Sequence, residues 1–164
     1  MRNLETLTAS WNRINSAHPN IQKASRLHTI VLSTNQLDSI PSGIYRLPQL
    51  TFLYLTNNKI SSVSADIQKI SNLQDLDLSH NPIKSIPPGI SRLSRLQSLG
   101  LGKTSLVHLP KEIANLKGQG LHINLARVKN FAERDKGGAI GKKTLKKMFG
   151  KNIWFKNPLF GENE

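Results

Sequence analysis

Residues 73–95, LQDLDLSHNPIKSIPPGISRLSR, contain the pattern that organises this chain. Leucine stands at positions 4, 27, 50, 73 and 96, so the pattern returns every 23 residues. A fixed period of this length is typical of repeat architectures. Within each period an LxL segment alternates apolar and other residues, which predicts a short strand with one apolar side. The second half of each period predicts a short helical or extended return on the outer side.

This pattern resembles the leucine-rich repeat family, in its LxxLxLxxNxLxxLPxxIxxLxx form of many bacterial and plant intracellular proteins. The resemblance covers roughly residues 4–125. It implies an α/β solenoid of about five coils with a parallel, concave β-sheet. One such coil cannot bury its own apolar side, so stacked coils must supply the core. We expect Asn35, Asn58 and Asn81 to form a ladder of buried amides that ends where Thr104 replaces asparagine.

The carboxy-terminal part of the chain leaves the repeat. We place the repeats in residues 1–125, a cap in residues 126–157 and a frayed tail in residues 158–164. Leu145, Met148 and Phe149 have the spacing of an amphipathic helix over 142–149, and the segment 153–155 reads as a short strand or apolar plug. A helix followed by a strand is therefore expected to cover the last coil.

Composition excludes several classes of protein. The 164 residues include no cysteine, which removes disulfides, thiol catalysis and thiolate zinc sites. No apolar run approaches the ~20 residues of a membrane helix, and the first residues do not resemble a secretory signal. These features predict a cytoplasmic protein, with export without an amino-terminal signal left open.

Catalytic motifs are also missing from the sequence. Residues 138–144, GAIGKKT, fail the phosphate-loop pattern because Lys136 stands where the first glycine belongs. The five histidines show no metal-ligand spacing and are expected to be solvated. We therefore predict a non-enzymatic protein with no cofactor and no metal.

The strand residues between the core leucines should form the exposed, concave face of the solenoid. There, two aromatic rings on one strand stand beside two carboxylates on the next, in a protein of net charge +13. Apolar anchors next to a charge that sets orientation are typical of interaction hot spots. The predicted partner-binding residues are Phe52, Tyr54, Asp75 and Asp77, with Val31, Trp11 and His80 around them. The alternative is that the rings only support cross-strand packing and the carboxylates only aid solubility.

The sheet face continues towards the carboxy terminus through two glycines and a histidine. We expect His122 to follow Gly100 in its column. The glycines at 100 and 102 are expected either to make room for a ligand backbone or to weaken a terminal strand.

A lysine cluster in the predicted cap offers a rival site. Residues 100–164 carry a net charge of +8, against +5 for residues 1–99. The cluster consists of Lys142, Lys143, Lys146, Lys147 and Lys151. It predicts, as the first alternative, electrostatic binding of an anionic membrane or nucleic acid. A second alternative is that the chain is the recognition part of a secreted bacterial effector or signalling scaffold.

Overall fold

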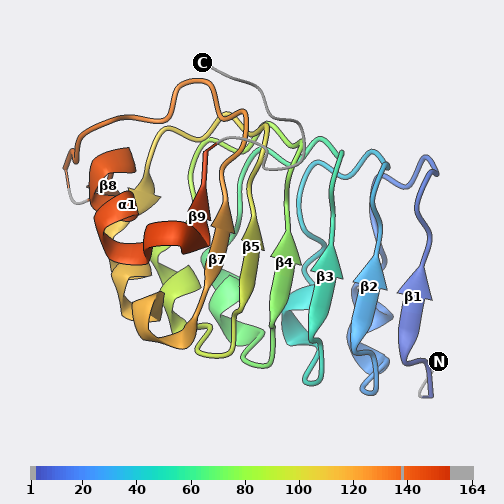
Figure 1. The fold of residues 1–164 in the computed structure, drawn as a ribbon. Helices are drawn as coiled ribbons and strands as arrows, with labels where there is room; N and C mark the ends of the chain where they lie inside the picture. Colours follow the sequence, from blue (N-terminus) through green and yellow to red (C-terminus); the bar gives the residue numbers. More distant parts are fainter. Residues whose placement is uncertain (1–2, 138, 156–164) are drawn as a thin grey trace.

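The computed structural model describes residues 3–137 and 139–155 and consists of stacked coils with a parallel sheet along one side (Figure 1). Each 23-residue period contributes one three-residue strand. The repeat strands are β1 (Thr6–Thr8), β2 (Thr29–Val31), β3 (Phe52–Tyr54), β4 (Asp75–Asp77) and β5 (Ser98–Gly100). The sheet continues through β7 (His122–Asn124) and β9 (Ile153–Trp154), in the order β1-β2-β3-β4-β5-β7-β9.

The middle residue of every strand points into the core. Leu53, Leu76 and Leu99 are directly in register and completely buried. The residues on either side of each middle residue point the other way, because side chains alternate along a strand. One continuous apolar core therefore lies behind the sheet, and the flanking positions form its exposed face.

Short 3₁₀ helices return the chain on the opposite side of the core (Figure 1). A turn of 3₁₀ helix fits a coil that has only 23 residues to close. Proline or a capping side chain starts all of these turns except the one at Ile44–Arg46: the Ser64 hydroxyl, for example, accepts from the Asp66 N–H at 3.2 Å. The helices are η1 (Pro19–Lys23), η2 (Ile44–Arg46), η3 (Ala65–Lys69), η4 (Pro88–Arg92) and η5 (Lys111–Gln119).

Buried asparagine side chains join successive coils at the turn after each strand. The Asn58 amide donates to Leu32 O in the preceding coil and to Leu55 O in its own, each at 3.0 Å. Its side-chain oxygen accepts from Leu37 N at 3.0 Å. Asn35 and Asn81 form the equivalent bonds. Backbone groups that would otherwise be unpaired where the coil bends are thereby satisfied.

This ladder stops at Thr104. The Thr104 hydroxyl donates to Leu101 O at 2.8 Å, within its own coil. Threonine is one bond shorter than asparagine and lacks the second donor with which Asn81 reaches the preceding coil. In the next coil, Val128 stands three residues after Leu125, the position that Thr104 holds after Leu101. Valine has no side-chain amide.

A cap closes the carboxy-terminal end of the stack, as the sequence predicts. Its helix α1 (Lys142–Phe149) has the predicted bounds and buries Leu145 and Phe149 over the last coil. A short η6 (Gly150–Asn152) leads into β9, which pairs with β7 and becomes the last strand of the main sheet. A separate antiparallel pair joins β6 (Leu109–Pro110) to β8 (Ala139–Ile140). The predicted frayed tail, 158–164, lies outside the described residues.

The opposite end of the stack is less well covered. Leu4, Leu7 and Ile21 of the first coil are only partly buried and line an apolar cavity of about 550 Å³. Trp11 in the same coil is 82% exposed. Across residues 3–137 and 139–155, no helix has the length and apolar character needed to cross a bilayer.

Candidate functional site

The strand register brings the predicted aromatic and acidic residues together on the exposed sheet face. Phe52 is in register with Asp75, and Tyr54 with Asp77. Val31 lies beside Tyr54 on the other side. Neighbouring strands are about 4.8 Å apart, so these side chains form one patch across β2, β3 and β4. We call Phe52, Tyr54, Asp75 and Asp77 the sheet-face patch.

Tyr54 and Asp75 are directly bonded across the two strands. The Tyr54 hydroxyl donates to Asp75 Oδ2 at 3.1 Å, along a diagonal of the sheet. Partial burial, followed by the charge of Asp75 and this hydrogen bond, raises the pKa of Tyr54 to about 12. The phenol is therefore a neutral donor that holds one carboxylate oxygen in place, and the other oxygen of Asp75 is available to a partner.

Asp77 is held by its own turn. Its Oδ1 accepts from Ser79 N at 2.8 Å. The carboxylate lies over Gly100, where an added Cβ would be 2.7 Å from Asp77 Cγ. Glycine at position 100 therefore accommodates Asp77, so the space is filled from within the protein and is not free for a ligand backbone.

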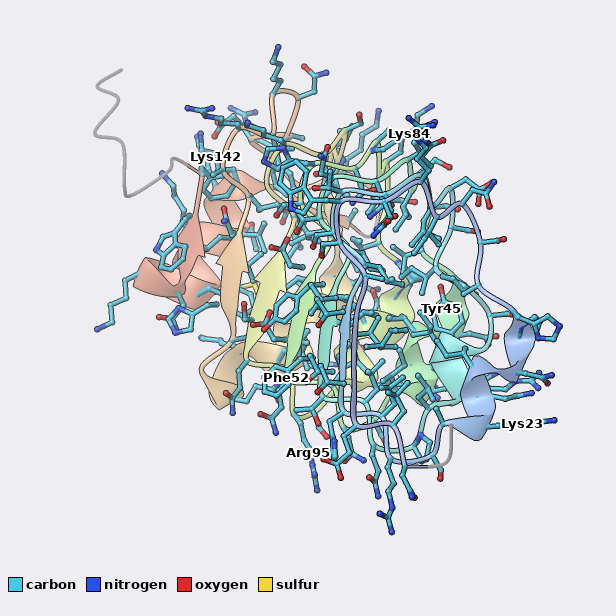
Figure 2. The ribbon with its side chains drawn as sticks, turned by 90° about the vertical axis from the view of Figure 1, so that its right-hand side faces the viewer. Lys23, Tyr45, Phe52, Lys84, Arg95 and Lys142 are labelled. Carbon is cyan, nitrogen blue, oxygen red and sulfur yellow. The ribbon has the colours of Figure 1, made fainter. Side chains whose placement is uncertain are left out.

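Phe52 supplies the exposed apolar surface of the patch. Its side chain is 36% exposed, and it lies on the sheet side of the molecule, away from the 3₁₀ helices that carry Tyr45 and Lys23 (Figure 2). The Tyr45 ring, in contrast, is buried on the helix side. An exposed ring next to two fixed carboxylates is suited to an apolar group that stands beside a cation.

A column of residues with left-handed backbone borders the patch. Each residue that follows the strand turn has a φ between 52° and 60°, a conformation that is uncommon for residues other than glycine. The column consists of Trp11, Thr34, Asn57, His80, Lys103 and Arg127. Its character changes from neutral to basic along the stack, because Lys103 and Arg127 occupy its carboxy-terminal end.

His80 stands between the acidic and the basic parts of this surface. Burial of part of the ring, followed by the charge of Lys103, lowers the pKa of His80. The charge of Arg127 also lowers this pKa, whereas the charge of Asp77 raises it. His80 thus borders the sheet-face patch, where the charge of Asp77 acts on its ring. Trp11 lies on the first coil, two coils before Phe52, and is not part of the same patch.

The predicted column position of His122 is wrong. His122 is in register with Ser98, and Asn124 stands beside Gly100. The reason is that η5 is nine residues long and ends at Gly120 in the left-handed region, so this coil is one residue longer than the others. His122 instead contacts Trp154 of β9, with ring centroids 5.8 Å apart.

The lysine cluster of α1 is partly occupied by contacts inside the cap. Lys142 forms an ion pair with Glu133 at 3.1 Å, and its Nζ lies 5.2 Å from the centroid of the Phe155 ring. Lys146 lies 5.7 Å from the same ring. Lys143, Lys147 and Lys151 are exposed.

The described part of the chain contains no group of three or more His, Asp or Glu side chains that could hold a metal ion. Four of the five histidines are exposed, and His108 differs from the prediction because its Nε2 is buried without a hydrogen-bond partner among the described residues.

The sequence reasoning also missed a basic cavity beside Lys103, to which Arg127 and Lys129 contribute. The recurrence of the turn position every 23 residues was the signal that pointed to Lys103.

The fold is a parallel β-solenoid whose sheet has one exposed face, and the comparisons agree with this class. Two family profiles match, described as "Leucine rich repeat" over residues 2–60 and "Leucine Rich repeats (2 copies)" over residues 48–88. A search of curated proteins finds no match. The chain belongs to the leucine-rich repeat family.

Solved structures of other leucine-rich repeat proteins share this architecture. A Leptospira interrogans leucine-rich repeat protein is 30% identical, with a TM-score of 0.83 over 94% of this chain and 38% of that one. A Listeria monocytogenes internalin is 25% identical, with a TM-score of 0.65 over 77% of this chain and 36% of that one.

A plant structure is similar as well. The leucine-rich repeat ectodomain of the Arabidopsis thaliana membrane receptor kinase GASSHO1/SCHENGEN3, in complex with CASPARIAN STRIP INTEGRITY FACTOR 2, is 29% identical. Its TM-score is 0.65 over 76% of this chain and 16% of that one. The chain thus spans less than two fifths of the length of each of these three structures.

Proposed function

We propose that this protein is a non-catalytic interaction module whose sheet-face patch binds a protein partner. The partner is expected to present an apolar group beside Arg or Lys, so that the apolar group covers Phe52 and the cation meets Asp75 and Asp77. The leucine-rich repeat fold commonly serves protein–protein interaction, and the plant structure carries a bound partner.

The observation that carries this proposal is the Tyr54–Asp75 pair next to exposed Phe52. A carboxylate already oriented by a phenol loses little freedom when a cation binds it, and preorganisation of this kind favours affinity. A merely solubilising carboxylate would not need a phenol bonded to it. Two aspartates fixed side by side on a strongly basic protein also favour a cationic group on the partner.

Affinity capture at low and moderate salt, followed by binding measurements on the recovered partner, tests the proposal. Asp75→Lys reverses the charge at the centre of the patch and should weaken binding by more than tenfold, as should Phe52→Ala. Asp66→Lys is the matched control, because Asp66 lies on η3 on the opposite side and pairs with exposed Lys69. Unchanged binding by Asp75→Lys, or equal loss in Asp66→Lys, would contradict the proposal.

The same experiment distinguishes the sheet-face proposal from the first alternative, electrostatic binding through the lysine cluster. Recovery of nucleic acid or anionic lipid that disappears at raised salt, and in the Lys143→Gln/Lys147→Gln variant, would favour the lysine cluster of α1 instead. The effector or scaffold role stays a prediction.

A further inference from the structure

Two backbone hydrogen bonds join the last two turns of the solenoid, one at each end of a short stretch. Lys103 N donates to Ala126 O at 2.8 Å, and Ala132 N donates to Val107 O at 2.8 Å. Between these two bonds, segments 104–106 and 127–131 run side by side. In earlier coils the asparagine of the later turn crosses this interval, as Asn81 does to Leu55 O, whereas Val128 stands at that position here and has no side-chain amide. An opening remains between the two turns.

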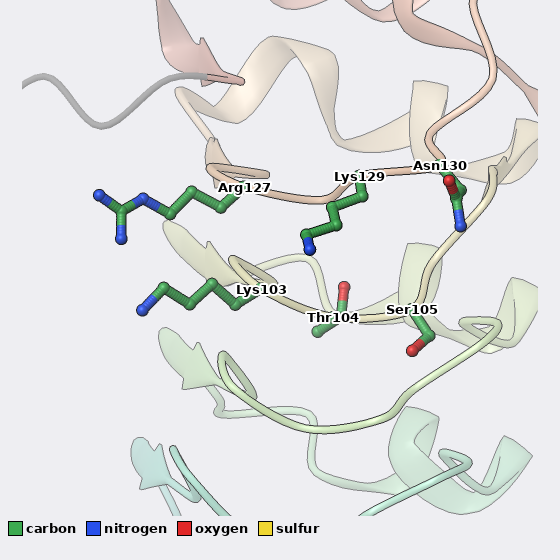
Figure 3. A pocket seen from close by; sticks show the side chains of 6 residues that line it. All are labelled: Lys103, Thr104, Ser105, Arg127, Lys129 and Asn130. Atoms are coloured by element: carbon green, nitrogen blue, oxygen red, sulfur yellow. The ribbon is translucent and has the colours of Figure 1, made fainter. Parts of the chain in front are cut away.

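This opening is a cavity of about 480 Å³ with a basic, polar lining. The described residues that line it are Lys103, Thr104, Ser105, Arg127, Lys129 and Asn130. None of these six carries a carboxylate. Lys129 extends across the space toward Thr104, and Ser105 and Asn130 lie at the far end, one on each turn (Figure 3). Lys103 and Arg127 leave the two turns side by side and point the same way (Figure 3).

Cations gathered in this way repel one another unless an anion lies among them. Arg127 takes part in another interaction of its own, so the argument depends on Lys103, Lys129 and the polar side chains. The same cations act on neighbouring His80: burial of part of its ring, followed by the charge of Lys103, lowers its pKa, with Arg127 acting in the same direction and Asp77 opposing it.

We propose that this cavity binds a phosphoryl group. Two ammonium groups, a hydroxyl and a side-chain amide line this one cavity from two turns, and a phosphoryl group offers several acceptor oxygens with more than one negative charge. A single carboxylate would leave most of these donors unmatched. This site is separate from the sheet-face patch, because its residues come from the turns and not from β3 and β4. The proposal therefore does not depend on the proposed binding of a protein partner.

The phosphoryl group has two sources, a small free anion or a phosphorylated side chain. Titration calorimetry with inorganic pyrophosphate represents the first source. A short phosphoserine peptide, compared with its unphosphorylated form, represents the second. Both titrations are made at a constant ionic strength of about 0.15 M, where long-range attraction is screened beyond roughly 8 Å.

The decisive variant is Lys103→Gln/Lys129→Gln, which keeps most of each side chain and removes both charges. Each lost charge-assisted bond should weaken binding roughly tenfold, so the pair should weaken it about a hundredfold. Lys143→Gln/Lys147→Gln is the matched control, because it removes the same net charge from exposed positions on α1. All variants should keep the melting temperature of the parent, since every substituted lysine is exposed.

Loss in the cavity variant with retention in the control supports the site. The tighter of the two ligands then identifies the source of the phosphoryl group. Equal weakening in both variants would overturn the proposal, because it would show only non-specific attraction to a basic protein. Failure of the parent protein to bind either ligand would overturn it as well, and neither result would affect the sheet-face proposal.

Discussion

Replacement of Asn81 by alanine tests the amide ladder that holds neighbouring coils together. The Asn81 side chain is 2% exposed. Its amide donates to Leu55 O at 2.9 Å and to Leu78 O at 3.0 Å, and its oxygen accepts from Ile60 N at 3.0 Å. Leu55 O keeps a second donor in the Asn58 amide. Alanine would therefore remove the ladder bonds of two buried groups, Ile60 N and Leu78 O.

Each buried group left without its partner costs about 1–3 kcal/mol. For two such groups the free energy of unfolding should fall by about 4 kcal/mol. In a chain of this length that loss lowers the melting temperature by roughly 8–16 °C. The effect should be large because the lost bonds join two coils, and each coil depends on its neighbours for stability.

Asn12→Ala is the matched control for this substitution. Asn12 holds the equivalent position in the first coil, but it is exposed. Its side-chain amide donates within that coil, to Ala9 O and Ser10 O. Its replacement should cost about 0.5 kcal/mol or less. Thermal and urea unfolding followed by circular dichroism measure both variants. Equal destabilisation by the two variants, or less than about 1 kcal/mol for Asn81→Ala, would refute the reasoning.

Two further predictions concern the sheet-face patch. Gly100→Ala should destabilise the fold by about 1–3 kcal/mol, because its Cβ would meet the Asp77 carboxylate, and Asp77→Ala in the same chain should recover most of the loss in a double-mutant cycle. In an absorbance titration, Tyr45 and Tyr54 should both ionise at about pH 12. Since the neutral phenols favour the folded state, their stabilisation is complete below pH 10 and is lost as the pH rises towards 12. Asp75→Asn should lower the pKa of Tyr54 and leave Tyr45 unchanged, and a shift in both would contradict the assigned pair.

The local pattern of residues was sufficient for the repeat, the strands and the core. Period, LxL alternation and the asparagine positions are all encoded within 23 consecutive residues, so each coil can be recognised without its neighbours. The cap helix over 142–149 was predictable for the same reason, because its apolar stripe is local. The sheet-face residues could also be grouped in advance, since a constant period places equal offsets side by side.

Contacts between coils decided everything that depends on register or on side-chain reach. The extra residue in the last repeat moved His122 into the Ser98 column, which a constant period could not reveal. The Tyr54–Asp75 bond and the filling of the Gly100 space arise from side chains that cross between strands. The basic cavity lies between two turns that are about one repeat apart in the sequence, and Val128 of the later turn has no side-chain amide to cross it. Such features require distances between segments that lie one or more repeats apart, and only the packed structure sets those distances.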